Sequence, residues 1–358
     1  MILARLRPGL LTHRPRWARF VSSGASDPLR ILFCGSDEFS CAALEALDGE
    51  RKRGGVVESV DVVVRPGKAV GRGYKKIREV PIKHLASELD LPIHERDTFT
   101  GFEPPSSINL VIAVSFGLFV PPRILRAAKY GGLNVHPSFL PDLRGAAPLH
   151  HALLQNRTHT GITLQTLDEK KFDHGLILAQ TPRPGIPIPP DCTIPQLTEL
   201  VKAPAAELLL DSLQKGLHVN PVGISGDEDG AATLAPRLTK EDRRINWNSP
   251  SVEIARRLRV LGPLWSEVAT RDGKTERIIM RDVEETKVPP SEGSEWKTVV
   301  CLGSAGEDHR PVEIRYLEED DGAVVVALPA GGTLRIREIV VGGKGARRAA
   351  TTFKSLTA

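Results

Sequence analysis

The sequence predicts an α/β protein of two domains: an N-terminal Rossmann-like domain built on a parallel sheet, followed by a C-terminal OB-like β-barrel. Apolar runs alternate with helical patterns as far as about residue 218, which is typical of a parallel sheet covered by helices. Short β-branched runs separated by Gly, Pro and acidic residues follow from about residue 238, which is typical of a small barrel. The 358-residue chain is also longer than one hydrophobic core usually organises.

The predicted N-terminal domain, residues 27–218, opens with a strand, a turn and a helix. The run LRILFCG at residues 29–35 is largely apolar, and apolar residues then recur at helical spacing over residues 39–47. We expect further strands at residues 56–64, 108–114, 133–136 and 161–167. We expect further helices at residues 82–89, 121–130, 151–155 and 194–213.

Residues 219–237 are predicted to link the two domains. Glycine, proline and aspartate gather in this stretch, and it sustains neither a helical nor a strand period. In the remaining residues, 238–358, we expect a short helix at 251–261. The strand-like runs that follow are RIIMRDV, TVVCLG, PVEIRYL, AVVVALP and LRIREIVV.

The first 26 residues have the composition of a mitochondrial targeting segment. Five arginines lie among leucines, serines and small residues, and no acidic residue precedes Asp27. The arginines interrupt every apolar stretch, which argues against a secretory signal. We therefore expect a protein of the mitochondrial matrix, with a disordered basic tail as the alternative. Without this segment basic and acidic residues nearly balance, so nucleic acid would have to bind to local basic patches.

Several classes of protein are excluded by what the sequence lacks. No apolar run approaches the length needed to cross a bilayer, so we expect no membrane contact. The four cysteines show neither C-x-x-C pairing nor histidine spacing, so we expect no metal site and no disulfide framework, and we expect Cys34 and Cys41 to be buried thiols. The glycines of GRG at residues 71–73 do not follow a strand–turn–helix pattern, so we predict no dinucleotide site.

The densest group of reactive side chains lies in NVHPSFLPDLRGAAP, residues 134–148. Asn134 and His136 are two residues apart, so they share one face at the end of a predicted strand. An amide and an imidazole there suit acyl transfer, because the tetrahedral oxyanion needs positioned donors. A hydrogen-bonded structural histidine is the alternative interpretation.

Acyl transfer to an amine also needs a group that removes a proton from the nitrogen. The nearby carboxylates follow the predicted strand GITLQTL, at Asp168, Glu169 and Asp173. Gly175 allows a tight turn that presents the Asp173 side chain, and Asp168 stays open as the alternative to Asp173.

NVHPSFLPDLRGAAP and TGITLQTLDEKKFDHG together resemble the folate-dependent formyltransferase family, and RGAAP resembles its methionyl-tRNA branch. With the targeting composition of the first 26 residues, the chain resembles the mitochondrial type of that branch. The resemblance implies a catalytic set of Asn134, His136 and Asp173, and 10-formyltetrahydrofolate as formyl donor. It implies folate-binding residues at Gly117, Ser138, Phe139, Leu140 and Pro141. HPS, in place of the commoner HGS, resembles the glycinamide ribonucleotide formyltransferases, and EKKF is one residue longer than the common bacterial pattern.

Upstream, VVVRPGKAVGRGYKKIREVPIK resembles the family's basic loop, which implies contact with initiator methionyl-tRNA. A flexible cationic loop suits phosphate contacts and ordering on binding, and a solvated surface loop is the alternative. The resemblance continues from ATLAPRLTKEDRRINW to the end of the chain, where basic residues at Arg335, Arg337, Lys344, Arg347 and Arg348 could follow phosphates. The predicted tRNA-binding residues are Arg65, Lys68, Arg72, Lys75, Lys76, Arg144, Lys344 and Arg347.

The predicted reaction is formylation of the methionyl amine, with Asn134 and His136 stabilising the oxyanion, Asp173 assisting deprotonation, and no metal. We expect a monomer. Two other functions stay open: a formyltransferase acting on a small amine, such as glycinamide ribonucleotide or an amino sugar, and a non-catalytic protein that escorts initiator tRNA.

Overall fold

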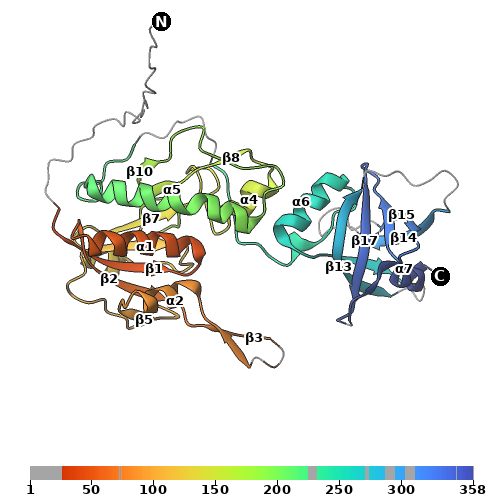
Figure 1. Ribbon diagram of the computed structural model, residues 1–358, viewed down its shortest axis with the longest axis horizontal. Helices are drawn as coiled ribbons and strands as arrows, with labels where there is room; N and C mark the ends of the chain where they lie inside the picture. Colours follow the sequence, from red (N-terminus) through yellow and green to blue (C-terminus); the bar gives the residue numbers. More distant parts are fainter. Residues whose placement is uncertain are drawn as a thin grey trace, which may run out of the picture.

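The computed structural model describes residues 26–71, 73, 75–224, 232–270, 274–286, 295–302, 311–343 and 345–357. The chain forms two lobes, an N-terminal α/β lobe and a C-terminal β-barrel, joined by a thin connection (Figure 1). The predicted fold classes of both lobes are confirmed. The predicted targeting segment lies outside the described residues, apart from Ser26.

A seven-stranded sheet, in the order β10-β9-β7-β6-β1-β2-β5, forms the N-terminal lobe. Its strands are β1 (Leu29–Gly35), β2 (Val57–Val64), β5 (Ile93–Glu95), β6 (Leu110–Val114), β7 (Gly132–His136), β9 (Thr163–Thr166) and β10 (Ile177–Gln180). The five strands from β7 to β5 run parallel. β9 and β10 are antiparallel additions, so the sheet is mixed where we predicted a parallel one.

Both faces of this sheet are covered, as the near-continuous apolar strands predict. Along β1, Ile31 and Phe33 join the larger core, whereas Leu32 and Cys34 face a second core on the other side. Helices α1 (Glu38–Lys52), α2 (Pro81–Glu88) and α5 (Ile194–Gln214) cover the first side, and α3 (Pro122–Ala127) covers the second. All four cysteines are free, and Cys41 is half-buried where we expected a buried thiol.

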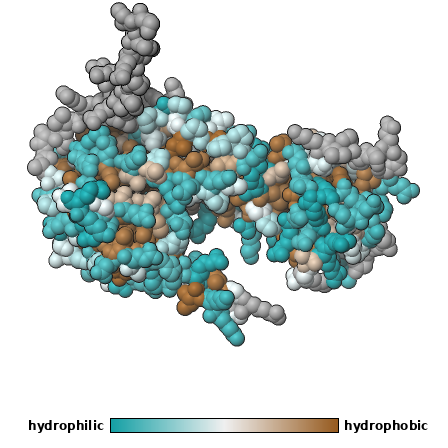
Figure 2. Space-filling model, viewed as in Figure 1, coloured by the Kyte–Doolittle hydropathy of each residue, from teal (hydrophilic) through white to brown (hydrophobic). Residues whose placement is uncertain are grey.

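The basic segment after β2 folds into a hairpin, which differs from the flexible loop that we predicted. β3 (Lys68–Val70) pairs antiparallel with β4 (Lys76–Arg78), and Val70 lies opposite Lys76. The hairpin stands away from the body of the lobe (Figure 1). Both hydrophilic and hydrophobic surface lies on it in Figure 2, and the Ile77 side chain is exposed.

The barrel consists of β12 (Leu264–Ala269), β13 (Thr275–Thr286), β14 (Lys297–Leu302), β15 (Pro311–Glu318), β16 (Val324–Ala327) and β17 (Thr333–Val341). These strands pair antiparallel, and the pairing of β13 with β17 closes the ring. Helix α6 (Ser251–Leu261) precedes the barrel, and α7 (Ala349–Thr357) packs against it through Phe353, whose ring meets Tyr316 edge to face. In the described parts of the chain, no helix is both long and apolar enough to span a bilayer.

Candidate active site

A cavity of about 510 Å³ opens where the parallel strands β1, β6 and β7 end. Ligands of such sheets bind at this edge, beyond the carboxyl ends of the strands. The cavity is lined by all three predicted catalytic residues, together with Gly117, Asp168 and residues of α4 (Pro148–Leu154). Arg237, the last residue of the predicted link between the lobes, and Leu238, which follows it, also line the cavity.

Strand β7 places Asn134 and His136 on one face, as the alternation along the strand predicts. Their neighbours Leu133 and Val135 point into the larger core. Across the sheet, Asn134 pairs with Gln165 of β9 and His136 pairs with Thr163. Directly paired residues share a face of the sheet, and three of these four side chains, Asn134, His136 and Gln165, line the cavity.

Asp173 reaches the same point from the segment after β9. Its Oδ1 lies 3.4 Å from Asn134 Nδ2 and accepts a hydrogen bond of 3.0 Å from Gln165 Nε2, and its Oδ2 accepts one of 2.9 Å from the Gly145 amide. Asp173 itself adopts a left-handed backbone conformation, with φ of 58°. Gly175 is required for steric reasons, because a Cβ at this position would lie 1.7 Å from the Thr166 carbonyl oxygen.

His136 lies between this carboxylate and a backbone carbonyl. Its Nε2 is 3.0 Å from the Leu143 oxygen, and its Nδ1 is 3.4 Å from Asp173 Oδ1. The carbonyl and an ionised carboxylate can both only accept, so a neutral imidazole can donate to one of them and an imidazolium to both. Burial lowers the pKa of His136, and the negative charge of Asp173 opposes that shift. In the protonated ring, the Nδ1 proton lies between His136 and the Asp173 carboxylate.

Strained backbone gathers around the cavity. Ser115, Leu143 and Asp173 all have φ near +50° to +60°, a region that residues with a Cβ rarely occupy. Each such residue costs on the order of 1–3 kcal/mol and persists only where its surroundings hold it in place. Leu143 has this backbone conformation and places its carbonyl oxygen within hydrogen-bond distance of His136.

The other carboxylates of the segment are used differently. Asp168 lines the cavity, but its Oδ1 accepts from the backbone amides of Lys170 and Lys171 at 2.8 and 2.7 Å, and these bonds lower the pKa of its carboxyl group. Glu169 forms an ion pair with Arg126. The geometry therefore favours Asp173 as the partner of His136.

The predicted folate-binding residues divide into two groups. Gly117 lines the cavity with Leu118 and Phe119. The other four lie beside it: Ser138, Phe139 and Leu140 are buried, and Pro141 is half-buried. Their polar contacts are internal, since Ser138 Oγ donates to the Asp142 carbonyl and the Leu140 amide donates to Thr163 Oγ1.

Two family models match the chain: Formyl transferase over residues 29–213, and Formyl transferase, C-terminal domain over residues 237–357. A mitochondrial methionyl-tRNA formyltransferase from Saccharomyces cerevisiae is 34% identical over 69% of this chain and 72% of its own length. The methionyl-tRNA formyltransferase of Staphylococcus aureus MW2 is 30% identical over 81% of this chain and 91% of its own length. The chain belongs to the methionyl-tRNA formyltransferase family.

A solved N-formyltransferase from Helicobacter canadensis shares the fold of this formyltransferase. It aligns with a TM-score of 0.52 over 86% of this chain and 98% of its own, at 15% sequence identity.

The predicted tRNA-binding residues of the formyltransferase lie in three places. Lys68, Lys75 and Lys76 are exposed on or beside the hairpin, whereas Arg65 at its base is engaged in an ion pair with Asp97 at 2.7 Å. Arg144 lies in the loop after β7, in backbone contact with residues 233–235. Arg347 is exposed on β18 (Arg347–Arg348). Arg72 and Lys344 lie outside the described residues.

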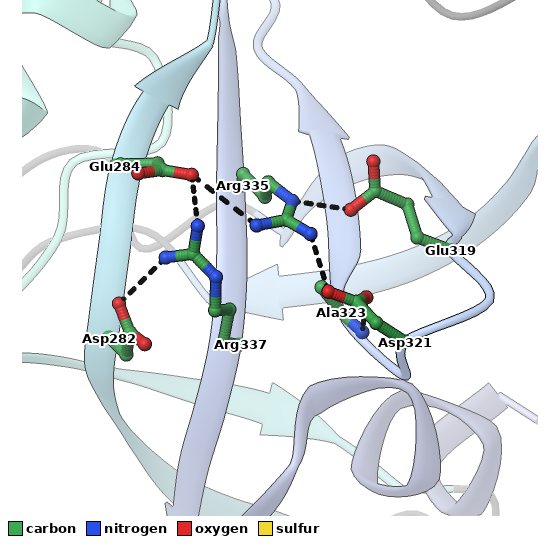
Figure 3. Close-up of polar contacts among 7 residues, drawn as sticks. All are labelled: Asp282, Glu284, Glu319, Asp321, Ala323, Arg335 and Arg337. Atoms are coloured by element: carbon green, nitrogen blue, oxygen red, sulfur yellow. Dashed lines mark hydrogen bonds and ion pairs between the residues drawn. The ribbon is translucent and has the colours of Figure 1, made fainter.

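Arg335 and Arg337 do not present free positive charge, contrary to our expectation. Figure 3 shows both side chains bound to carboxylates of neighbouring strands and loops. Arg335 contacts Glu319 and Asp321 at 2.5 Å and Glu284 at 3.4 Å, and Arg337 contacts Glu284 and Asp282. Four carboxylates thus surround two guanidinium groups, so the positive charge of this cluster is already balanced within the barrel.

Gln165, Thr233 and Arg237 are site residues that the sequence reasoning missed. Gln165 could have been found from strand alternation, because it lies on the polar face of the strand that carries Thr163. Thr233 and Arg237 come from the stretch predicted as a linker, where no periodic signal exists. Among the described residues, no group of three His, Cys, Asp or Glu side chains is arranged to hold a metal ion.

Proposed function

We propose that this chain transfers the formyl group of 10-formyltetrahydrofolate to the amino group of initiator methionyl-tRNA in the mitochondrial matrix. The observation that carries the proposal is the meeting of Asn134, His136 and Asp173 in one cavity. An amide, an imidazole and a carboxylate are what acyl transfer to an amine requires.

The chemistry assigns one task to each residue. The methionyl nitrogen attacks the formyl carbon, a C–N bond forms, and the carbonyl oxygen gains negative charge. Asn134 Nδ2 stabilises that oxyanion as a hydrogen-bond donor, and His136 stabilises it through the positive charge of its protonated ring. Asp173 takes the proton that the attacking nitrogen releases, and the proton returns to the folate nitrogen as its bond to the formyl carbon breaks. Holding both substrates in one cavity supplies much of the rate.

The donor and the acceptor are proposed from separate observations. Gly117, Leu118 and Phe119 form a wall of the cavity that suits the flat ring system of the folate, and the solved Helicobacter enzyme is described in complex with folinic acid. We propose that Ser138, Phe139, Leu140 and Pro141 support this folate site, since their bonds hold the chain after β7 in place. For the acceptor, the exposed lysines of the hairpin supply phosphate contacts.

The mitochondrial matrix is proposed from the arginine-rich first 26 residues and from the mitochondrial yeast relative. Residues 219–237 are proposed as the link between a catalytic domain (27–218) and a tRNA-binding barrel (238–358).

A comparison of two acceptor amines, each supplied separately, tests the proposal. The chain beginning at residue 27 is incubated with 10-formyltetrahydrofolate and either methionyl-tRNA or glycinamide ribonucleotide, and formylated product is measured. We expect product from methionyl-tRNA alone. Product only from the small amine would contradict the proposal, as would tight binding of tRNA without formylation.

A further inference from the structure

The loop that holds the proposed catalytic pair, residues 142–147, is itself held by a segment from the other end of the lobe. The Leu143 carbonyl oxygen faces His136 Nε2, and the Gly145 amide donates to Asp173 Oδ2. One short loop therefore contacts both members of the pair, and any shift in it changes their separation.

Residues 233–235, in the link between the lobes, run beside this loop and bond to it along its backbone. The Arg144 amide donates to the Thr233 carbonyl at 2.9 Å, the Ala235 amide donates to the Arg144 carbonyl at 2.6 Å, and the Ala147 amide donates to the Ala235 carbonyl at 3.0 Å. The Ala235 side chain is fully buried against Leu143 and Ala152. A Cβ on Gly145 would lie 2.5 Å from the Ala235 carbonyl oxygen, so the two segments can lie this close only with glycine at position 145.

Thr233 also bonds to this loop through its side chain, at Leu143 and Asp142. Its Oγ1 accepts from the Leu143 amide at 2.9 Å and donates to the Asp142 carboxylate. Leu143 has φ of 57°, a conformation that its own side chain disfavours and that its surroundings must maintain. The Thr233 hydroxyl therefore holds the Leu143 amide, and the carbonyl of the same residue holds His136.

We infer that Thr233 is a positioning residue for formyl transfer, and that residues 233–235 belong to the catalytic apparatus although they lie outside its sheet. Thr233 acts through Leu143 on His136 and does not touch the reacting atoms. The inference rests on the proposed catalytic role of His136 and Asp173.

The test compares Thr233→Val, which keeps the shape and removes the hydroxyl, with Thr233→Ser, which restores it. Misplacement of a catalytic group by about 1 Å costs on the order of 10²-fold in rate, so we expect Thr233→Val to lower kcat by about 10- to 100-fold. KM for methionyl-tRNA and for the folate should stay within about twofold, and Thr233→Ser should recover most of the rate. Thr239→Val is the matched control, because Thr239 bonds to Asp242 and not to the loop.

Hydrogen exchange of residues 142–147 gives a second measurement that does not depend on activity. Thr233→Val should accelerate exchange there relative to wild type and to Thr239→Val, because the Leu143 amide loses its acceptor. A wild-type kcat in Thr233→Val, or a raised KM for tRNA with kcat unchanged, would overturn the inference and leave the proposed function standing. Absence of formyl transfer by the wild-type protein would instead refute the proposed function.

Discussion

His136 Nδ1 lies 3.4 Å from Asp173 Oδ1, while the other ring nitrogen faces the Leu143 carbonyl at 3.0 Å. Both nitrogens thus face oxygen acceptors. The neutral ring can donate to one of these acceptors, whereas the protonated ring donates to both and pairs with the carboxylate. Burial lowers the pKa of His136, and the negative charge of Asp173 opposes that shift, so the carboxylate favours the protonated ring that burial disfavours.

Gln165→Glu should shift the pH dependence of the reaction. Gln165 Nε2 donates to Asp173 Oδ1 at 3.0 Å, so the substitution places a second carboxyl group at hydrogen-bond distance. Two carboxylates this close do not readily ionise together, so the pKa at which the pair becomes fully ionised rises. We expect the acidic limb of the kcat profile to move upward by at least about one pH unit.

Gln165→Met is the control, since it removes the donor without adding charge. It should lower kcat and move the limb upward by less than Gln165→Glu does, because it removes one hydrogen bond to the carboxylate and adds no second carboxyl group. An unshifted profile in Gln165→Glu would show that Asp173 does not need to be ionised.

Removing charge from the hairpin should weaken tRNA binding, whereas removing it from the paired arginines of the barrel should not. Lys75→Gln with Lys76→Gln removes two exposed cations, so the slope of log K against log salt should become shallower by about two. Arg335→Gln with Arg337→Gln removes the same formal charge from a cluster already surrounded by carboxylates. Filter binding of methionyl-tRNA across a salt series measures both slopes, and equal losses would contradict our assignment of the two surfaces.

His218 should make the N-terminal lobe lose stability in acid. The ring is buried beside Tyr130, its Nε2 is 2.8 Å from Ser26 Oγ, and burial lowers its pKa to about 4. The unfolded chain binds the proton near pH 6.5, so this contribution is complete above that pH and is lost as pH falls toward 4.

Urea unfolding followed by circular dichroism, at pH 7.5 and pH 5, measures the effect. The free energy of unfolding of wild type should fall by about 2 kcal/mol more than that of His218→Gln. The same pH dependence in both proteins would show that the ring titrates normally in the folded state.

The strands and helices that carry the cavity could be predicted because their signals are local. β1, β6 and β7 are apolar runs bounded by turns, and the alternation of Asn134 and His136 along β7 already places both side chains on one face. Asp173 could be proposed from its spacing to Gly175, although the close contact with Thr166 that requires this glycine was not predictable.

The features that were missed depend on contacts between distant parts of the chain. Strand direction is set by the connections, so β9 gave no local sign of running antiparallel to β7. The pairing of residues 233–235 with the loop after β7 spans about ninety residues and uses backbone groups that every sequence offers. Arg335 appeared free because its carboxylate partners lie on other strands and turns of the barrel.

Single-turnover formylation by Asp173→Asn, compared with Asp168→Asn, examines the role of the carboxylate itself. Both changes keep the size of the side chain and remove one charge from the lining of the same cavity. With methionyl-tRNA and 10-formyltetrahydrofolate saturating, we expect Asp173→Asn to slow the chemical step by about 10²- to 10⁴-fold, the usual contribution of a general base, and Asp168→Asn to react within about threefold of wild type. A fast Asp173→Asn protein beside a slow Asp168→Asn protein would contradict the assignment and make Asp168 the catalytic carboxylate.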